Sequence, residues 1–132
     1  REVRSLIFHL LYALESFDYT ISLTEVVTIF NREFETGILF DGEVVHVVQG
    51  IIDERTDLDK KIEPLLSNWK LDRLEWSTRL ILRLALWEML HTKTASTIII
   101  NEAIELSKSF SEKDSYKFVN GILDEAAKQL YT

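Results

Sequence analysis

The spacing of apolar side chains along the chain predicts helices from its start. In residues 2–16, apolar positions recur at intervals of three and four, which is the pattern of an amphipathic helix. Ser22 followed by Glu25 is a capping-box signature, in which each residue hydrogen-bonds the backbone of the other. It predicts a second helix that runs to about Phe34.

The next segment is ambiguous between a strand and a helix. Residues 36–42 are expected to form a loop, and its Asp41-Gly42 dipeptide, with four valines close behind, is compatible with a β-hairpin. The valines and isoleucines of residues 43–54 also follow helical spacing over three turns, with acidic residues on the other face. We favour a helix here.

The rest of the chain continues the helical pattern. Thr56 is expected to cap the start of a helix, and Pro64 to weaken or end it, before a link from Ser67 to Lys70. Apolar stripes then predict three more helices at residues 77–91, 97–110 and about 114–130. Seven helices with short links and no convincing strand pair predict an all-α fold.

Composition fits one helical domain. A chain of 132 residues is expected to form a single domain, and one proline and four glycines leave few helix breakers. Without cysteine, the chain has no disulfide, thiolate nucleophile or cysteine-based zinc site. No apolar run approaches the roughly 20 residues of a membrane span, and the N-terminus lacks a signal-peptide pattern. We therefore expect a cytoplasmic protein with no membrane attachment.

The net charge of −7 argues against a general nucleic-acid binder, because phosphate contacts need lysine and arginine. The charge is unevenly distributed. Residues 1–66 carry 13 acidic and 6 basic residues, whereas residues 67–132 carry 9 of each. A local basic face therefore remains compatible with the acidic total.

Catalytic signatures are missing from the sequence. The three histidines, at positions 9, 46 and 91, have no metal-ligand spacing to one another or to a carboxylate. The chain has no Gly-x-Ser-x-Gly elbow and no glycine-rich phosphate loop. Carboxylate pairs such as Asp53-Glu54 fall on predicted solvent faces. We expect a protein that is not an enzyme and uses no cofactor and no metal.

Lys117-Phe118, near the start of the last predicted helix, is a candidate for RNA contact. A cation next to an aromatic ring can hold a phosphate while a base stacks on the ring. The alternative is a core phenylalanine beside a surface lysine. In the same helix, Asn120-Gly121 departs from the helical pattern, and the glycine suggests close approach of another helix.

Other basic and aromatic residues could extend this face. Arg79 and Arg83 are four apart on one predicted helix and are expected to project from the same side. Arg1 and Arg4 share the first turn of the first helix, and Tyr12 lies two turns further on. If the three helices share an edge, these side chains form a small basic, aromatic face.

The second half of the chain resembles the NusB family of bacterial transcription antitermination factors. The resemblance covers nearly all of residues 69–128, and the first half contributes chiefly Arg1, Arg4 and Leu11-Tyr12. The matching residues are Trp69, Leu71 to Leu74, Ile81 to Leu90, Ile100 to Phe110 and Asp114 to Asp124.

The resemblance implies an all-α fold of two small packed bundles in one domain, with an N-terminal half of residues 1–66 and a C-terminal half of residues 67–132. It implies binding to boxA RNA, a single-stranded element of nascent ribosomal RNA transcripts. It also implies a partnership with NusE, a small-ribosomal-subunit protein, in an antitermination complex on RNA polymerase. The residues that would contact RNA are Arg1, Arg4, Tyr12, Asp72, Arg83, Asp114, Ser115, Lys117 and Phe118. The helical spacing adds Arg79 to them.

Two alternatives stay open. One is a helical protein–protein adaptor with weak or no RNA binding, which the acidic first half favours. The other is a NusB-like domain cut from an RNA methyltransferase, where such a domain precedes the catalytic part. The sequence does not decide between a monomer and a homodimer.

Overall fold

The computed structural model is all-α over residues 1–67 and 70–131, which are the residues that the structure describes. Seven α-helices and two 3₁₀ turns make up its regular structure, and no strand occurs among those residues. In chain order they are α1 (Glu2–Ser16), α2 (Leu23–Phe34), α3 (Glu43–Asp53), α4 (Arg55–Ile62), η1 (Glu63–Leu65), η2 (Leu71–Arg73), α5 (Trp76–His91), α6 (Ser96–Phe110) and α7 (Ser115–Leu130). The predicted all-α class is confirmed.

The chain forms two compact units, Arg1–Asp53 and Glu54–Thr132, called here the N-terminal unit and the C-terminal unit. The division falls before α4, so this helix belongs with the C-terminal unit and not with the N-terminal half expected from the sequence. Trp69 and part of the link from Ser67 to Lys70 lie outside the described residues.

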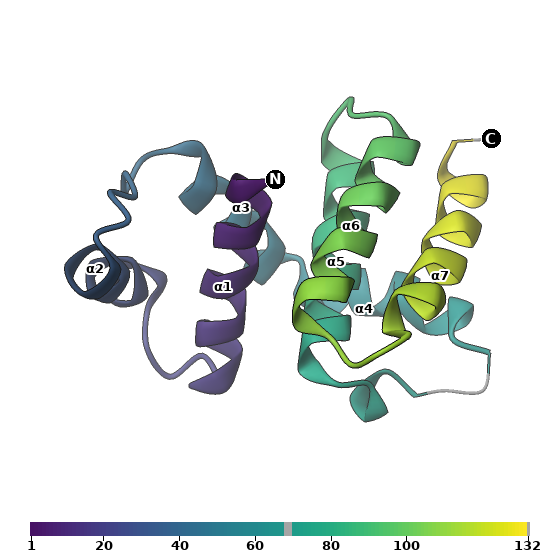
Figure 1. Ribbon diagram of the computed structural model, residues 1–132, viewed down its shortest axis with the longest axis horizontal. Helices are drawn as coiled ribbons and strands as arrows, with labels where there is room; N and C mark the ends of the chain where they lie inside the picture. The colour runs from purple at the N-terminus through teal and green to yellow at the C-terminus, as the bar shows by residue number, and fades with distance from the viewer. Residues whose placement is uncertain (68–69, 132) are drawn as a thin grey trace. The chain divides into compact units, whose positions relative to one another are not determined.

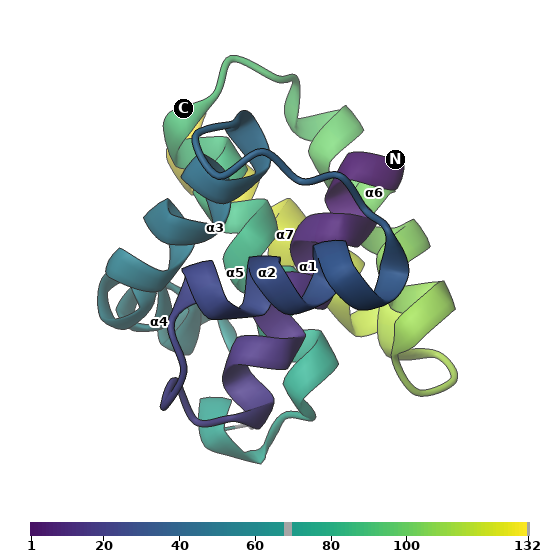
Figure 2. The same cartoon turned by 90° about the vertical axis from the view of Figure 1, so that its left-hand side faces the viewer.

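In the N-terminal unit, α1 packs against both α2 and α3, and Figure 2 shows α2 lying across α1. The predicted capping box is present. The Glu25 backbone N–H donates to Ser22 Oγ at 3.1 Å, and the Ser22 backbone N–H donates to Glu25 Oε1 at 3.2 Å. Residues 43–53 form a helix, so the hairpin alternative is excluded. Its buried Val47, Val48 and Ile51 face the core.

In the C-terminal unit, α5 is the central helix. It packs against α4, α6 and α7, and α6 and α7 also pack against each other (Figure 1). Every residue from Leu80 to Trp87 is buried, so almost the whole circumference of α5 is covered. A helix covered on all sides is expected to be apolar throughout, and a charged residue inside it needs a partner. Arg83 is such a charged residue within the buried part of α5, so it needs a partner of opposite charge.

The start of α4 corrects one prediction. Thr56 is not its cap, because the helix begins at Arg55 and the backbone N–H of Leu58 already bonds the Glu54 carbonyl at 2.8 Å. Pro64 does end the helix, which tightens into η1. The Glu54 carboxylate is also not the solvated group that the sequence suggested.

Glu54 accepts hydrogen bonds from two side chains of α5. Trp87 Nε1 donates to its Oε2 at 3.1 Å, and His91 Nε2 lies 2.8 Å from its Oε1. Trp87 itself is buried. Glu54 therefore fastens the beginning of α4 to α5.

One prediction about α7 is wrong. Gly121 is not a helix-packing contact, because it is exposed and a Cβ built on it would meet nothing within 4 Å. Leu130, the last residue of the helix, is 39% exposed. Among the described residues, no helix has the length and apolar character needed to cross a membrane.

Candidate nucleic-acid interface

The ten residues predicted to contact RNA are divided between the two units. Arg1, Arg4 and Tyr12 belong to the N-terminal unit, on or next to α1. The other seven, Asp72, Arg79, Arg83, Asp114, Ser115, Lys117 and Phe118, belong to the C-terminal unit. The two groups are therefore described separately.

In the N-terminal unit, Arg1 is exposed just before α1, and Arg4 is half-buried in the first turn. Tyr12 is 41% exposed and lines a largely apolar hollow of about 420 Å³, beside His9 and Phe34. Burial lowers the pKa of His9 below its ordinary value of 6.5, which keeps this imidazole neutral near pH 7. The hollow thus offers aromatic surface, whereas the two arginines, Arg1 and Arg4, lie at the start of α1.

In the C-terminal unit, four of the predicted residues gather at the start of α7, called here the α7 edge. Asp114 precedes the helix in a left-handed conformation, with φ of 69°. Lys117 is 67% exposed, and its Nζ lies 3.8 Å from Asp114 Oδ1. Ser115 and Phe118 are half-buried. An exposed ammonium therefore stands next to an aromatic ring that is still accessible.

Two further residues of this edge, Lys108 and Tyr116, were not predicted from the sequence. Lys108, at the end of α6, places its Nζ 4.9 Å from the centroid of the Tyr116 ring, and Lys117 Nζ lies 5.9 Å from the same centroid. Both distances are within the range of cation–π attraction. The signal that could have found the pair is the short break between α6 and α7, which brings the last turn of one helix beside the first turn of the next.

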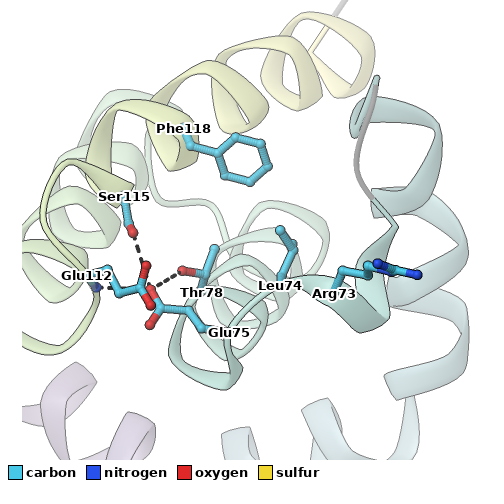
Figure 3. Close-up of a pocket in the computed structure, with 7 residues that line it drawn as sticks. All are labelled: Arg73, Leu74, Glu75, Thr78, Glu112, Ser115 and Phe118. Carbon is cyan, nitrogen blue, oxygen red and sulfur yellow. Dashed lines mark hydrogen bonds between the residues drawn. The ribbon is translucent and has the colours of Figure 1, made fainter.

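Phe118 lines two separate hollows. One, of about 330 Å³, lies between α7 and the start of α5 (Figure 3). The other, of about 510 Å³, includes Lys117 and the exposed Gly121 in its wall. Two hollows that share one aromatic ring in their walls suit a surface that receives flat, unstacked bases.

Glu75 is the third residue that the sequence reasoning missed. Its Oε1 accepts hydrogen bonds from Thr78 Oγ1 at 3.0 Å, from the backbone N–H of Glu112 at 3.0 Å and from Ser115 Oγ at 3.2 Å (Figure 3). The carboxylate thus joins the beginning of α5 to the turn that leads into α7. No pattern of spacing connects residues 75 and 112, so only the structure reveals this contact.

Asp72 and Arg79 line a different hollow, of about 540 Å³, together with Asp59 and Lys70. Asp72 is exposed, whereas Arg79 is half-buried, and its Nε is buried with no hydrogen-bond partner among the described residues. Arg79 and Arg83 lie on the same side of α5, since both are near Asp59, but α5 is covered there and Arg83 is buried while Arg79 keeps part of its surface exposed.

Arg83 is buried, with 6% of its surface exposed. Its Nε donates to Asp59 Oδ1 at 2.7 Å and its Nη2 donates to Asp59 Oδ2 at 2.8 Å. This bidentate pair neutralises an otherwise costly buried charge and joins α5 to α4. A phosphate that used this edge of Arg83 would have to displace the Asp59 carboxylate.

Comparison with known proteins gives one consistent family. A model of the NusB family matches residues 1–128. "Transcription antitermination protein NusB" of Staphylococcus epidermidis strain RP62A is 38% identical over 123 residues, covering 93% of this chain and 94% of the relative. The protein of the same name from Macrococcus caseolyticus strain JCSC5402 is 40% identical over 127 residues, covering 96% and 95%.

Solved structures agree with the fold. The structure of T. maritima NusB matches with a TM-score of 0.83 and 30% sequence identity, over 98% of this chain and 90% of that one. A chain from a structure titled "Crystal Structure of a Plectonemic RNA Supercoil" matches with a TM-score of 0.84 over 98% and 94%. Because that chain is 24% identical, the second match supports the fold alone.

Proposed function

This chain belongs to the NusB family, and we propose that it is a transcription antitermination factor that binds boxA-type single-stranded RNA together with NusE. In this role it is not an enzyme. It holds a short RNA segment and presents it, with the partner protein, to an antitermination complex on RNA polymerase.

The α7 edge carries the proposal. The Lys117 ammonium is largely exposed and adjacent to Phe118, a ring that lines two hollows. Phosphate contacts would supply affinity without reading sequence, and bases stacked on aromatic rings would supply selectivity. Lys108 adds a second cation to the same edge.

The charge distribution supports RNA binding at a few places and not over a broad surface. The N-terminal unit carries three basic and nine acidic residues, a net charge of −6. Two of those three basic residues, Arg1 and Arg4, stand at the start of α1. The C-terminal unit carries twelve basic and thirteen acidic residues, a net charge of −1.

We propose different roles for the predicted contacts. Arg1, Arg4, Arg79 and Lys117 would meet phosphates, and Tyr12 and Phe118 would stack on bases. Asp72, Asp114 and Ser115 would hydrogen-bond base edges or sugars. Arg83 would act through the fold, because its guanidinium is buried against Asp59.

The decisive experiment is a binding isotherm of a fluorescent boxA-like RNA, with and without NusE, from about 50 to about 200 mM salt. We expect binding that NusE tightens and salt weakens. Absence of binding at the lowest salt, with NusE present, would refute the RNA function.

A second candidate is a protein–protein adaptor that does not bind RNA. The acidic N-terminal unit and its apolar hollow, beside a Phe34 that is 67% exposed, favour a basic partner protein. The same experiment separates the two, because an adaptor would bind NusE while leaving the RNA free. Light scattering of the protein alone would decide between a monomer and a homodimer.

A further inference from the structure

We propose that Glu75 is a positioning residue that holds the start of α7, and with it Lys117 and Phe118, in the geometry that binds RNA. The inference rests on the proposed RNA function and deepens it. It assigns a role in RNA binding to a carboxylate, which by charge alone would oppose that binding.

The start of α7 has no side-chain cap. Asp114 occupies the N-cap position in a left-handed conformation, and its side chain makes no capping hydrogen bond. A residue other than glycine in this conformation carries backbone strain, and it persists where surrounding contacts hold it. The turn before α7 has a backbone hydrogen bond of its own, from Ser115 N–H to the Glu112 carbonyl at 3.1 Å, and is also held by side-chain contacts from elsewhere in the unit.

Glu75 supplies these contacts. It binds the turn through the Glu112 backbone N–H and the first residue of α7 through the Ser115 hydroxyl. Thr78 fixes the carboxylate from within α5, and this threonine is only 3% exposed. A buried donor that holds the acceptor in place makes the three bonds a rigid junction.

A second link joins the same two segments. Ser111 Oγ donates to Ser77 Oγ at 3.0 Å. Ser111 lies one residue after the end of α6, and Ser77 lies in the first turn of α5. The turn is therefore tied to α5 at both of its ends. Without Glu75, only the Ser111 end would remain fastened by these side chains.

Two residues proposed to contact RNA come shortly after Ser115 in the chain. Lys117 and Phe118 lie two and three positions after Ser115 in the same helix. Phe118 also lines the same hollow as Glu75 (Figure 3). A shift of the first turn of α7 would move the ammonium and the ring together, so loss of Glu75 would reach the RNA through them.

The test depends on the sign of the effect. Removing a carboxylate near bound RNA should tighten binding if only charge matters, whereas the positioning role requires weaker binding. Glu112 provides a matched control, because its exposed side chain lines the same hollow while its backbone N–H is the group that Glu75 binds. Glu112→Ala removes the same charge and leaves the junction intact.

RNA binding should separate the variants. We expect Glu75→Ala to weaken binding to the boxA-like RNA about tenfold at low salt, and still measurably at high salt, because the displaced Phe118 ring contributes a contact that salt does not screen. Glu112→Ala should bind equally well or more tightly at low salt, with the difference fading as salt rises. Glu75→Gln should restore most of the affinity, because the three bonds converge on one oxygen that an amide keeps.

A second measurement needs no RNA. The backbone N–H at position 112 should exchange its hydrogen faster in Glu75→Ala than in the parent chain or in Glu112→Ala. Circular dichroism should show that the helices remain folded. Unchanged exchange would overturn the inference, and so would faster exchange with unchanged RNA affinity. A third outcome separates the two proposals: the parent chain binds no RNA, but hydrogen exchange at position 112 still responds to Glu75→Ala. The proposed RNA function would then be refuted, and with it the role of Glu75 in RNA binding.

Discussion

Arg83 on α5 and Lys117 on α7 are both cations of the C-terminal unit, and both were expected to contact RNA. Arg83 is 6% exposed and held by Asp59 through two short hydrogen bonds. Lys117 has a side chain that is 67% exposed, with a longer contact of 3.8 Å to Asp114. One cation stabilises the unit internally, and the other is available to a ligand.

The difference comes from where each helix lies. The central helix α5 packs against three others, whereas α7 leaves one face open, as the exposed Gly121 shows. A cation inside a covered helix is retained only with a partner, because an unpaired buried charge is very costly. Residue type and helical spacing thus suggest a basic face, and packing decides which of its members can reach RNA.

Breaking the Arg83–Asp59 pair should have the largest effect on stability. We expect Arg83→Ala to lower the free energy of unfolding by about 3 kcal/mol, because it leaves a partly buried carboxylate unpaired. Urea unfolding measures this. Lys128→Ala, which removes an exposed contact of 3.9 Å to Glu125, is the control and should change stability by less than about 0.5 kcal/mol.

The opposite result for Arg83 would change the comparison. If Arg83→Ala kept the stability of the parent chain and still lost RNA affinity, Arg83 would belong to the RNA surface and the Asp59 pair would be incidental.

Lys117→Ala should affect binding and spare the fold. We expect RNA affinity to fall about fivefold, and the slope of log K against log salt to decrease in size by about 0.7, the value for one phosphate of a single strand. The free energy of unfolding should stay within about 0.5 kcal/mol. Lys128→Ala, on the last turn of the same helix, should leave both affinity and slope unchanged. An unaltered slope for Lys117→Ala would remove this lysine from the phosphate contacts.

Gly121→Ala should have the smallest effect and the opposite sign. A Cβ at this position meets nothing within 4 Å, so alanine should stabilise the helix by about 0.5 to 1 kcal/mol. Thermal unfolding measures this change. The same variant shows which of the two hollows lined by Phe118 the RNA uses. Weaker RNA binding would indicate the hollow of about 510 Å³ that Gly121 lines, and unchanged binding the hollow of about 330 Å³ beside Glu75. A loss of stability would mean that another part of the protein packs on this glycine.

The sequence was sufficient for the helices because periodicity and capping are local. Residues 43–53 form a helix despite their valines, and Ser22 with Glu25 caps α2 as predicted. The error at Thr56 was also local, since the helix begins at Arg55, before the residue that looked like its cap.

The errors in the candidate site have a different origin. Arg83 pairs with Asp59 across 24 positions, and Glu75 reaches Ser115 across 40. Gly121 looked like a packing contact, but which helix face lies open is settled by tertiary packing. Such long-range contacts leave no regular spacing in a single sequence, so the prediction of RNA contact at Asp114, Ser115, Lys117 and Phe118 stays open to the tests above.

The shared position of Phe118 has a thermodynamic consequence. One ring forms part of the wall of both hollows, so whatever fixes its rotamer from one side alters the shape of the other. Two ligands that meet at such a side chain are linked, and each changes the affinity of the other by the same factor. Nucleotides in these two hollows would then be coupled, and RNA shortened by one nucleotide would change in affinity by an amount that differs from the contacts of that nucleotide alone.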